Sequence, residues 1–395
     1  MPEESVLWLS NGHGEDRIAK VLLSQDTWGA TRHLAFPLVG EGLAYREAGV
    51  PVMSPIRVMP SGGFILREPG VLRRDLAHGL VQLTFRQLLA IRGVAASASL
   101  VVAIGDILPL VFAYLTGRPY VFVSCAKSDY YRPLGREDHL AIERFFMTRS
   151  HCLAVYPRDR LTARSLQDRG IHAHDFGNPM MDDLELSSRP WPGSASGAVL
   201  GLLPGSRRDA PMNFPLLLQA AMRFLSLQHG GEGWSVAVAV ASGISIAELA
   251  HAGCMAGWSV REEGGLLSPA GHRLDWIEDR FGDWVRRVDL VFGMAGTAIE
   301  QCAGFGVPVV TFPGPGPQFS VEFAKAQARL LGRAVRLTSG PEAAAREAVE
   351  WLSRPSEVEA ARAEGLERMG RSGAASRLVT HMLQVSSAAG RGTSI

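Results

Sequence analysis

Short apolar runs that alternate with helix-forming stretches are the feature that most limits how this chain folds. Such runs are typical of strands buried in a parallel sheet, and the stretches between them are long enough to be crossover helices. The pattern predicts an α/β protein. In the first half the expected strands are Ser5–Leu9, Leu100–Ile104, Tyr120–Val123 and Cys152–Tyr156. The expected helices lie near Glu15–Ser24, Leu72–Ala96, Leu108–Thr116, Arg136–Thr148 and Asp159–Arg169.

A stretch rich in Ser, Pro and Gly between Ser187 and Gly197 interrupts the alternation and is typical of an interdomain linker. The alternation then begins again. The expected strands of the second half are Ala198–Leu203, Ser235–Val240, Leu290–Phe292, Pro308–Thr311 and Ala334–Leu337. The expected helices are Phe214–Gln228, Ile246–Ala256, Trp276–Val288, Thr297–Gly306 and Val321–Leu331.

The length of 395 residues suits two domains of about 200 residues each. We expect two Rossmann-like domains at residues 1–188 and 198–385, the last helices of the second packing back on the first. The small, polar residues 386–395 predict a disordered tail. Open α/β sheets bind ligands at the carboxyl ends of their strands, so two such domains facing each other across a cleft predict a site in that cleft.

Charge and cysteine content exclude several classes of function. The formal net charge is +1 and there is no basic run, so nucleic acid is not an expected partner. The four cysteines are far apart and form no CxxC pair, which argues against a zinc site and for a reducing, cytoplasmic location.

Neither a leader peptide nor a membrane span is expected. The first strand begins almost at once, without the basic residues of a signal peptide. The most apolar segment, Leu100–Val123, is interrupted by Asp106, Pro109 and Arg118, as expected of a strand, a helix and a second strand. Any membrane contact is therefore expected to be peripheral, at the inner face of the cell membrane.

The segment Ser10-Asn-Gly-His-Gly-Glu-Asp16 joins the first strand to the first helix. Glycines there allow a close approach of a ligand to the helix N-terminus. A plain turn whose acidic residues favour the helix dipole is the alternative, but it does not need an imidazole between two glycines. The segment lacks the G-x-G-x-x-G pattern of a dinucleotide site. The residues expected to serve a site here are Asn11, Gly12, His13 and Gly14.

Asp106 directly follows a strand and precedes a helix. At the carboxyl end of the strand it could accept a proton from an attacking hydroxyl, or it could cap the helix, and the two roles are compatible. Lys127, Asp129 and Tyr130 follow the next strand and are expected on the same rim, although ordinary surface loops have a similar composition.

Two loops of the second half have the composition of an anion-binding site. Gly205, Ser206 and Arg207 offer backbone amides, a hydroxyl and a permanent cation, the parts of a diphosphate clamp. An exposed arginine without a ligand is the alternative. Gly296 directly precedes an expected helix and Thr297 begins it, so both lie at a helix N-terminus, where an anion can bind.

Glu300 lies one turn inside that helix, where it could reach the hydroxyls of a ribose. Thr297-x-x-Glu300 is also a capping box, which explains both residues without a ligand. It does not explain the Pro- and Gly-rich loop that ends at Gln318. Nucleotide-sugar binding is therefore the favoured interpretation.

These motifs resemble those of lipid-A-disaccharide synthases and, more distantly, of other GT-B glycosyltransferases such as the undecaprenyl-linked GlcNAc transferase of peptidoglycan synthesis. The resemblance rests on Leu203–Arg207, on Gly296-Thr297-x-x-Glu300 and on Gly306-x-Pro308. Gly177–Asp182 resembles the family's Gly-His-Pro-x-x-Asp segment, and Ser10–Asp16 resembles the branch of lipid-A-disaccharide synthase-related proteins.

The resemblance implies a GT-B fold and a role for each matching residue. The residues that would bind the nucleotide-sugar donor are Gly205, Ser206, Arg207, Gly296, Thr297, Glu300 and Gln318. The residues on the acceptor side would be Asn11, Gly12, Gly14, Lys127, Asp129 and Tyr130. Two departures lie on that side: the first loop differs from the synthases' Gly-Glu-Pro-Ser-Gly-Asp type, and Ser124–Tyr131 replaces an aromatic segment. The acceptor is therefore not expected to be the lipid A precursor itself.

The expected reaction is an inverting, metal-independent transfer of a sugar from a UDP-sugar to a lipid or lipid-linked acceptor, with Asp106 or His13 as the base. The chain has no Asp-x-Asp motif and no cofactor is expected. Pro60–Leu66 and a following helix with Leu76, Leu80, Leu83 and Leu88 are an expected apolar acceptor surface. The alternatives are a UDP-sugar 2-epimerase, whose Gly-Asn-x-x-x-Asp pattern resembles Gly177–Asp182, and a non-catalytic nucleotide-sugar-binding protein.

Overall fold

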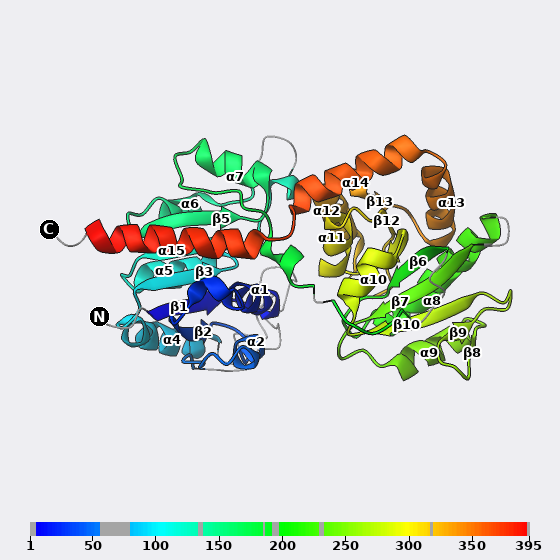
Figure 1. The fold of residues 1–395 in the computed structure, drawn as a ribbon, viewed down its shortest axis with the longest axis horizontal. Helices are drawn as coiled ribbons and strands as arrows, with labels where there is room; N and C mark the ends of the chain where they lie inside the picture. Colours follow the sequence, from blue (N-terminus) through cyan, green and yellow to red (C-terminus); the bar gives the residue numbers. More distant parts are fainter. Residues whose placement is uncertain are drawn as a thin grey trace. The chain divides into compact units, whose positions relative to one another are not determined.

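The computed structural model describes residues 5–55, 80–132, 137–184, 186–191, 197–228, 233–316 and 319–392. The chain divides into two compact units (Figure 1). Unit 1 contains Met1–Asp183 and Gly370–Ile395, and unit 2 contains Leu184–Met369.

Unit 1 is built on a five-stranded parallel sheet with the order β2-β1-β3-β4-β5. Apart from β2, which begins with polar residues, each strand is a short apolar run buried on both faces, as the sequence pattern predicts. The strands are β1 (Ser5–Ser10), β2 (Arg32–Pro37), β3 (Leu100–Ile104), β4 (Tyr120–Ser124) and β5 (Cys152–Pro157).

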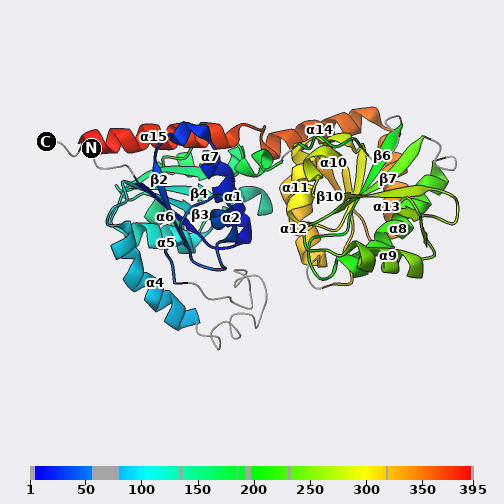
Figure 2. The same ribbon diagram turned by 60° about the horizontal axis from the view of Figure 1, so that its bottom comes forward.

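Alternate side chains of these strands enter two separate cores, because successive residues of a strand point to opposite faces. On β1, Val6 and Trp8 pack against α1 (His13–Leu23) and α15 (Ala374–Gly392). Leu7 and Leu9 belong to the other core. Figure 2 shows α15 and α4 on opposite sides of this sheet. The helices of the second face are α4 (Leu80–Ala95), α5 (Ile107–Leu115), α6 (Ala141–Met147) and α7 (Arg160–Gln167), and the remaining helical segments are α2 (Leu43–Glu47), η1 (Asp26–Trp28), η2 (Asp129–Tyr131) and η3 (Pro179–Asp182).

Unit 2 is built on an eight-stranded sheet with the order β13-β12-β11-β6-β7-β10-β9-β8, parallel except for the pairings of β9 with β10 and with β8. Its strands are β6 (Ala198–Leu203), β7 (Trp234–Val240), β8 (Ser259–Val260), β9 (Leu266–Leu267), β10 (Arg273–Glu278), β11 (Leu290–Gly293), β12 (Val309–Thr311) and β13 (Val335–Leu337). Its helices are α8 (Ala210–Leu227), α9 (Ile246–Met255), α10 (Phe281–Arg287), α11 (Thr297–Gly304), α12 (Val321–Leu331), α13 (Pro341–Leu352), α14 (Pro355–Met369) and the short η5 (Gly332–Ala334).

Several features differ from the sequence-based expectation. No strand was expected at β2, which begins with the polar pair Arg32-His33, or at β8, β9 and β10. The expected helix Trp276–Val288 is wrong at its start, because Trp276 lies in β10 and the helix begins at Phe281. The described part of the expected linker is held on unit 2, where the Ser187 N–H donates to Asp283 Oδ1 at 3.1 Å.

The C-terminal segment differs only at its end. Residues 370–392 belong to unit 1, in line with the expectation that the last helices pack back on the first domain, but α15 continues through Gly392 where a disordered tail was expected. Asp182 accepts hydrogen bonds from the backbone N–H groups of Gly373 and Ala375 at the start of α15. No helix among the described residues is long and apolar enough to cross a membrane.

Candidate functional site

Side-chain hydrogen bonds join the two ends of the Ser10–Asp16 segment of unit 1 to each other and to Tyr45. Ser10 Oγ donates to Asp16 Oδ1 at 2.5 Å, and Tyr45 Oη donates to Ser10 Oγ at 2.9 Å. The Asp16 N–H donates to the Gly12 carbonyl at 2.9 Å, inside the first turn of α1. These contacts fix the path of the backbone through Asn11 and Gly12.

The Asp16 carboxyl is 2 % exposed and its Oδ2 has no hydrogen-bond partner. Burial disfavours the charged form and raises the pKa of Asp16 to about 6, although the hydrogen bond from Ser10 opposes this shift. Asp16 therefore titrates close to the physiological range.

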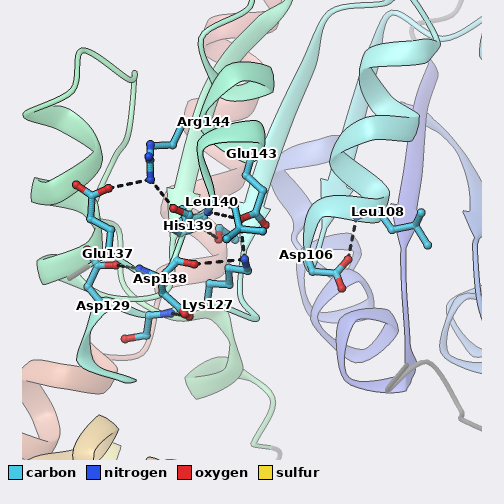
Figure 3. Close-up of polar contacts among 12 residues, drawn as sticks. Asp106, Leu108, Lys127, Asp129, Glu137, Asp138, His139, Leu140, Glu143 and Arg144 are labelled. Carbon is cyan, nitrogen blue, oxygen red and sulfur yellow. Dashed lines mark hydrogen bonds and ion pairs between the residues drawn. The ribbon is translucent and has the colours of Figure 1, made fainter. Parts of the chain in front are cut away.

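Asn11 and Asp106 meet at the carboxyl ends of the neighbouring strands β1 and β3. Asn11 Nδ2 donates to Asp106 Oδ1 at 3.0 Å. Asp106 is also the N-cap of α5, since its Oδ1 accepts from the Leu108 N–H at 3.0 Å (Figure 3). The capping interpretation of Asp106 is thus correct, and its half-buried side chain is left with one oxygen that neither donor uses.

His13 is the first residue of α1 and is exposed, as is Gly14. The His13 ring lies beside Gly40, where a β-carbon would be 3.5 Å from His13 Cε1. Gly12 is the N-cap in an extended conformation. No hydrogen bond joins His13 to Asp106 among the described contacts.

Lys127 and Asp129 belong to a local network of ion pairs and hydrogen bonds. These contacts explain both side chains without a bound acceptor substrate. Lys127 Nζ forms an ion pair with Glu143 Oε2 at 2.6 Å, and Glu143 is fully buried. Asp129 is 8 % exposed, and its Oδ1 accepts from the Asp138 N–H at 2.8 Å (Figure 3). Tyr130, in the following 3₁₀ turn, is half-buried.

His139 belongs to the same network and was not predicted. Its Nε2 lies 2.7 Å from Ser124 Oγ, and its ring is 3 % exposed. Burial, with the neighbouring Lys127 charge, lowers the pKa of His139 to about 4. The imidazole is therefore neutral at physiological pH.

The expected apolar acceptor surface is only partly described. Pro60–Leu66 and Leu76 lie outside the described residues, as does the side chain of Leu80. Leu83 is 5 % exposed and Leu88 packs against the core, so these two do not form an open surface. The exposed apolar side chains of α4 are instead Phe85 and Leu89.

The two loops of unit 2 that were expected to bind an anion lie against each other at the carboxyl ends of β6 and β11. The Met294 N–H donates to the Leu203 carbonyl at 2.8 Å. Gly205 has φ +110°, and a β-carbon there would lie 3.1 Å from the Met294 carbonyl oxygen. A side chain would therefore disturb this approach of the two loops. Ser206 and Arg207 are exposed on the first loop.

The capping box expected at Thr297-x-x-Glu300 is not formed. Gly296 is the N-cap of α11 and Thr297 is its first helical residue, so no side chain caps the helix N-terminus. Thr297 is exposed and Glu300 is 8 % exposed. The buried Gln327, which was not predicted, supports the loop: its Nε2 donates to the Gly296 carbonyl at 2.9 Å.

The loop after β12 also approaches the Arg207 loop. At Gly316 a β-carbon would lie 2.5 Å from Asp209 Cβ, and at Gly314 it would lie 2.4 Å from Asn213 Oδ1. The two glycines of this loop are therefore explained by close packing on the start of α8. Gln318 lies outside the described residues. Within the described chain, no group of three His, Cys, Asp or Glu side chains is placed to hold a metal ion.

Solved structures of low sequence identity share this architecture over almost the whole chain. The calicheamicin glycosyltransferase CalG4 has a TM-score of 0.62 at 15 % identity, covering 98 % of each chain. MurG from Acinetobacter baumannii has a TM-score of 0.60 at 12 % identity, covering 96 % of this chain and 99 % of its own. The fold is GT-B. The predicted fold class is confirmed.

A third GT-B structure is an isomerase. The UDP-GlcNAc 2-epimerase from Neisseria meningitidis, solved with UDP-GlcNAc bound, has a TM-score of 0.57 at 11 % identity, covering 96 % of this chain and 99 % of its own. No family model and no curated protein matches the sequence. This chain therefore shares its GT-B fold with both glycosyltransferases and epimerases. The resemblance to lipid-A-disaccharide synthases stays a prediction.

Proposed function

We propose that this protein is an inverting, metal-independent glycosyltransferase that moves a sugar from a UDP-sugar to a hydroxyl of a lipid or lipid-linked acceptor. The observation that carries the proposal is the contact between the two glycine loops of unit 2. Gly205 and Met294 bring the exposed Arg207 loop and the uncapped N-terminus of α11 to the same edge of the sheet. A cation and a helix N-terminus side by side suit a diphosphate.

The donor would be held by residues of these loops and by the carboxylate one turn inside α11. Backbone N–H groups at Gly296 and Thr297 and the guanidinium of Arg207 would stabilise the charge that develops on the departing UDP. Glu300 would accept hydrogen bonds from the ribose. We assign Gly205 and Ser206 to the diphosphate and Gln318 to the same nucleotide-sugar site.

The acceptor hydroxyl must lose its proton as it attacks the anomeric carbon, and Asp106 is the better candidate for the base. Its position at the end of β3 is fixed by two hydrogen bonds to one oxygen. His13 is exposed one residue into α1 and is the second candidate. Of the other acceptor-side residues, Asn11, Gly12 and Gly14 belong to the same loop.

Exposed apolar side chains of unit 1 support a lipid acceptor. Phe85 and Leu89 on α4 are 61 % and 68 % exposed. Ile142 and Phe145 on α6, which contacts α5 on the same face of the sheet, are also exposed. Apolar side chains in such positions suit a peripheral contact with a membrane that holds the acceptor.

A UDP-sugar 2-epimerase is the second candidate, favoured by the solved epimerases with the same fold. Incubation with UDP-N-acetylglucosamine alone separates the two activities. The proposed transferase would leave the donor unchanged until a lipid acceptor is added and would then release UDP, whereas an epimerase would convert the sugar at C2 without an acceptor and retain the nucleotide. Calorimetric titration with UDP tests the site that both candidates require.

A further inference from the structure

We infer that Asn11 is a positioning residue that orients Asp106, so that Oδ1 is held by two donors and Oδ2 faces the proton of the acceptor hydroxyl. This inference rests on the proposed function. It gives a role to the side-chain amide of Asn11 in the Ser10–Asp16 motif.

Both donors reach the same oxygen of Asp106. The Leu108 N–H and Asn11 Nδ2 each lie 3.0 Å from Oδ1. A carboxylate with a single N–H donor can still tilt about its Cβ–Cγ bond. A second donor from a different strand end restricts the plane of the carboxylate, so that the oxygen without a donor points in one direction. Among the described residues none donates to Oδ2.

Asn11 is itself buried. It is 8 % exposed, and its Oδ1 has no hydrogen-bond partner. Filling space alone would be served better by an aliphatic side chain, since an unpaired buried carbonyl is unfavourable. The Ser10 carbonyl accepts from the Leu38 N–H at 2.8 Å, and the Ser10–Asp16 hydrogen bond closes the loop from the other side. The amide is therefore presented to Asp106 by fixed backbone.

Other titratable groups lie near Asn11 and Asp106. Asp16, in the same loop as Asn11, has its pKa raised to about 6 by burial. Glu15 lies beside Gly105, where a β-carbon would be 3.0 Å from Glu15 Cγ. The buried Cys125 thiol, on the neighbouring strand end, is close enough to interact electrostatically with both Asp106 and Glu15. A pH profile would report several of these groups together, so kcat and KM at one pH are the better measure of the lost amide.

The test is the rate of UDP release from UDP-N-acetylglucosamine in the presence of a membrane lipid extract, with kcat and KM for the donor measured separately. In Asn11→Ala kcat should fall about tenfold to a hundredfold, with KM for the donor unchanged. Asp106→Asn should lower kcat by at least about a hundredfold. In the double variant, Asn11→Ala should cause no further loss, because Asn11 acts only through Asp106.

Asn178→Ala is the matched control. Asn178 is also a fully buried asparagine of unit 1, and its Oδ1 accepts from the Met180 N–H at 3.0 Å. It should lower stability without lowering kcat. An Asn11→Ala protein with the wild-type kcat contradicts the role of Asn11 alone. A wild-type protein that releases no UDP with or without lipid contradicts the proposed function instead.

Discussion

The Asp182 carboxylate accepts a hydrogen bond from the Ala375 N–H at 2.7 Å, across 193 positions of the sequence. The same carboxylate accepts from the Gly373 N–H. Asp182 therefore caps α15 and ties the end of the Gly177–Asp182 segment to the helix that returns to unit 1. The segment's resemblance to a family motif thus has a structural cause in this chain.

Removing this cap should destabilise the protein. We expect Asp182→Ala to lower the free energy of unfolding by about 1–2 kcal/mol, measured by urea denaturation. Asp175→Ala is the control, because within the described part of the chain Asp175 pairs only with the exposed Arg160, at 3.8 Å. This change should alter stability by less than about 0.5 kcal/mol. Equal losses in the two variants would show that α15 does not depend on Asp182.

UDP should stabilise the protein by about 2.7 kcal/mol at a concentration one hundred times its Kd. Arg207→Ala should remove most of this stabilisation, because the guanidinium is the permanent cation of the proposed clamp. Arg208→Ala, a neighbouring exposed arginine, should retain it. The measurement is the shift of thermal unfolding on addition of UDP. An Arg207→Ala protein that responds like the wild type would show that the clamp is wrongly assigned.

Glu300→Gln should weaken UDP binding more than it lowers stability. The capping box would have required the reverse result, but Thr297 is not the N-cap of α11. Gln keeps the size of the side chain and removes the charge that favours ribose hydroxyls. The UDP affinity, measured by calorimetry, and the stability, measured by urea unfolding, distinguish a role in ligand binding from a role in folding. A stability loss with unchanged affinity would assign Glu300 to folding alone.

Asp16 should make stability fall as pH rises. Its pKa is raised from 3.8 to about 6 in the folded protein, so the folded state binds the proton more tightly than the unfolded state. The resulting stability is fully present below about pH 4 and is lost as pH rises through about 6, a difference of about 3 kcal/mol.

Asp16→Asn isolates this contribution. Relative to the wild type, the variant should be more stable at about pH 8 than at about pH 4. The comparison between the two proteins cancels His139, whose lowered pKa has the opposite effect, a loss of stability as pH falls from 6.5 towards about 4. Urea unfolding at both pH values gives the difference. A wild-type-minus-variant difference that does not change with pH would contradict the burial of a titrating carboxyl.

The fold could be predicted largely from the sequence because its strands are buried on both faces. β1, β3, β4 and β6 are continuous apolar runs, and their positions were correct within one or two residues. β2 was missed since its first two residues are polar. The tail was expected to be disordered because Ser386–Gly392 is small and polar, but these residues extend an amphipathic helix whose earlier turns pack on unit 1.

The contacts within the candidate site could be predicted less well, because they join residues far apart in the chain. Asn11 and Asp106 are 95 positions apart, and nothing local to either residue indicates their hydrogen bond. Lys127 was expected on the rim of the sheet because it follows a strand, but its partner Glu143 comes from α6. Gln327 supports the Gly296 loop from α12. The spacing of residues within one segment gives no information about contacts between distant segments.

The most direct test of the proposed transferase is UDP release from UDP-N-acetylglucosamine in the presence of a membrane lipid extract, with UDP affinity measured in parallel. The wild-type protein should bind UDP and release it from the donor in a lipid-dependent reaction. Asp106→Asn should bind UDP normally and react at least about a hundredfold more slowly, as expected for loss of a general base. His13→Ala separates the second candidate base. Conversion of the donor to its C2 epimer without UDP release, or an Asp106→Asn variant as active as the wild type, would contradict this account.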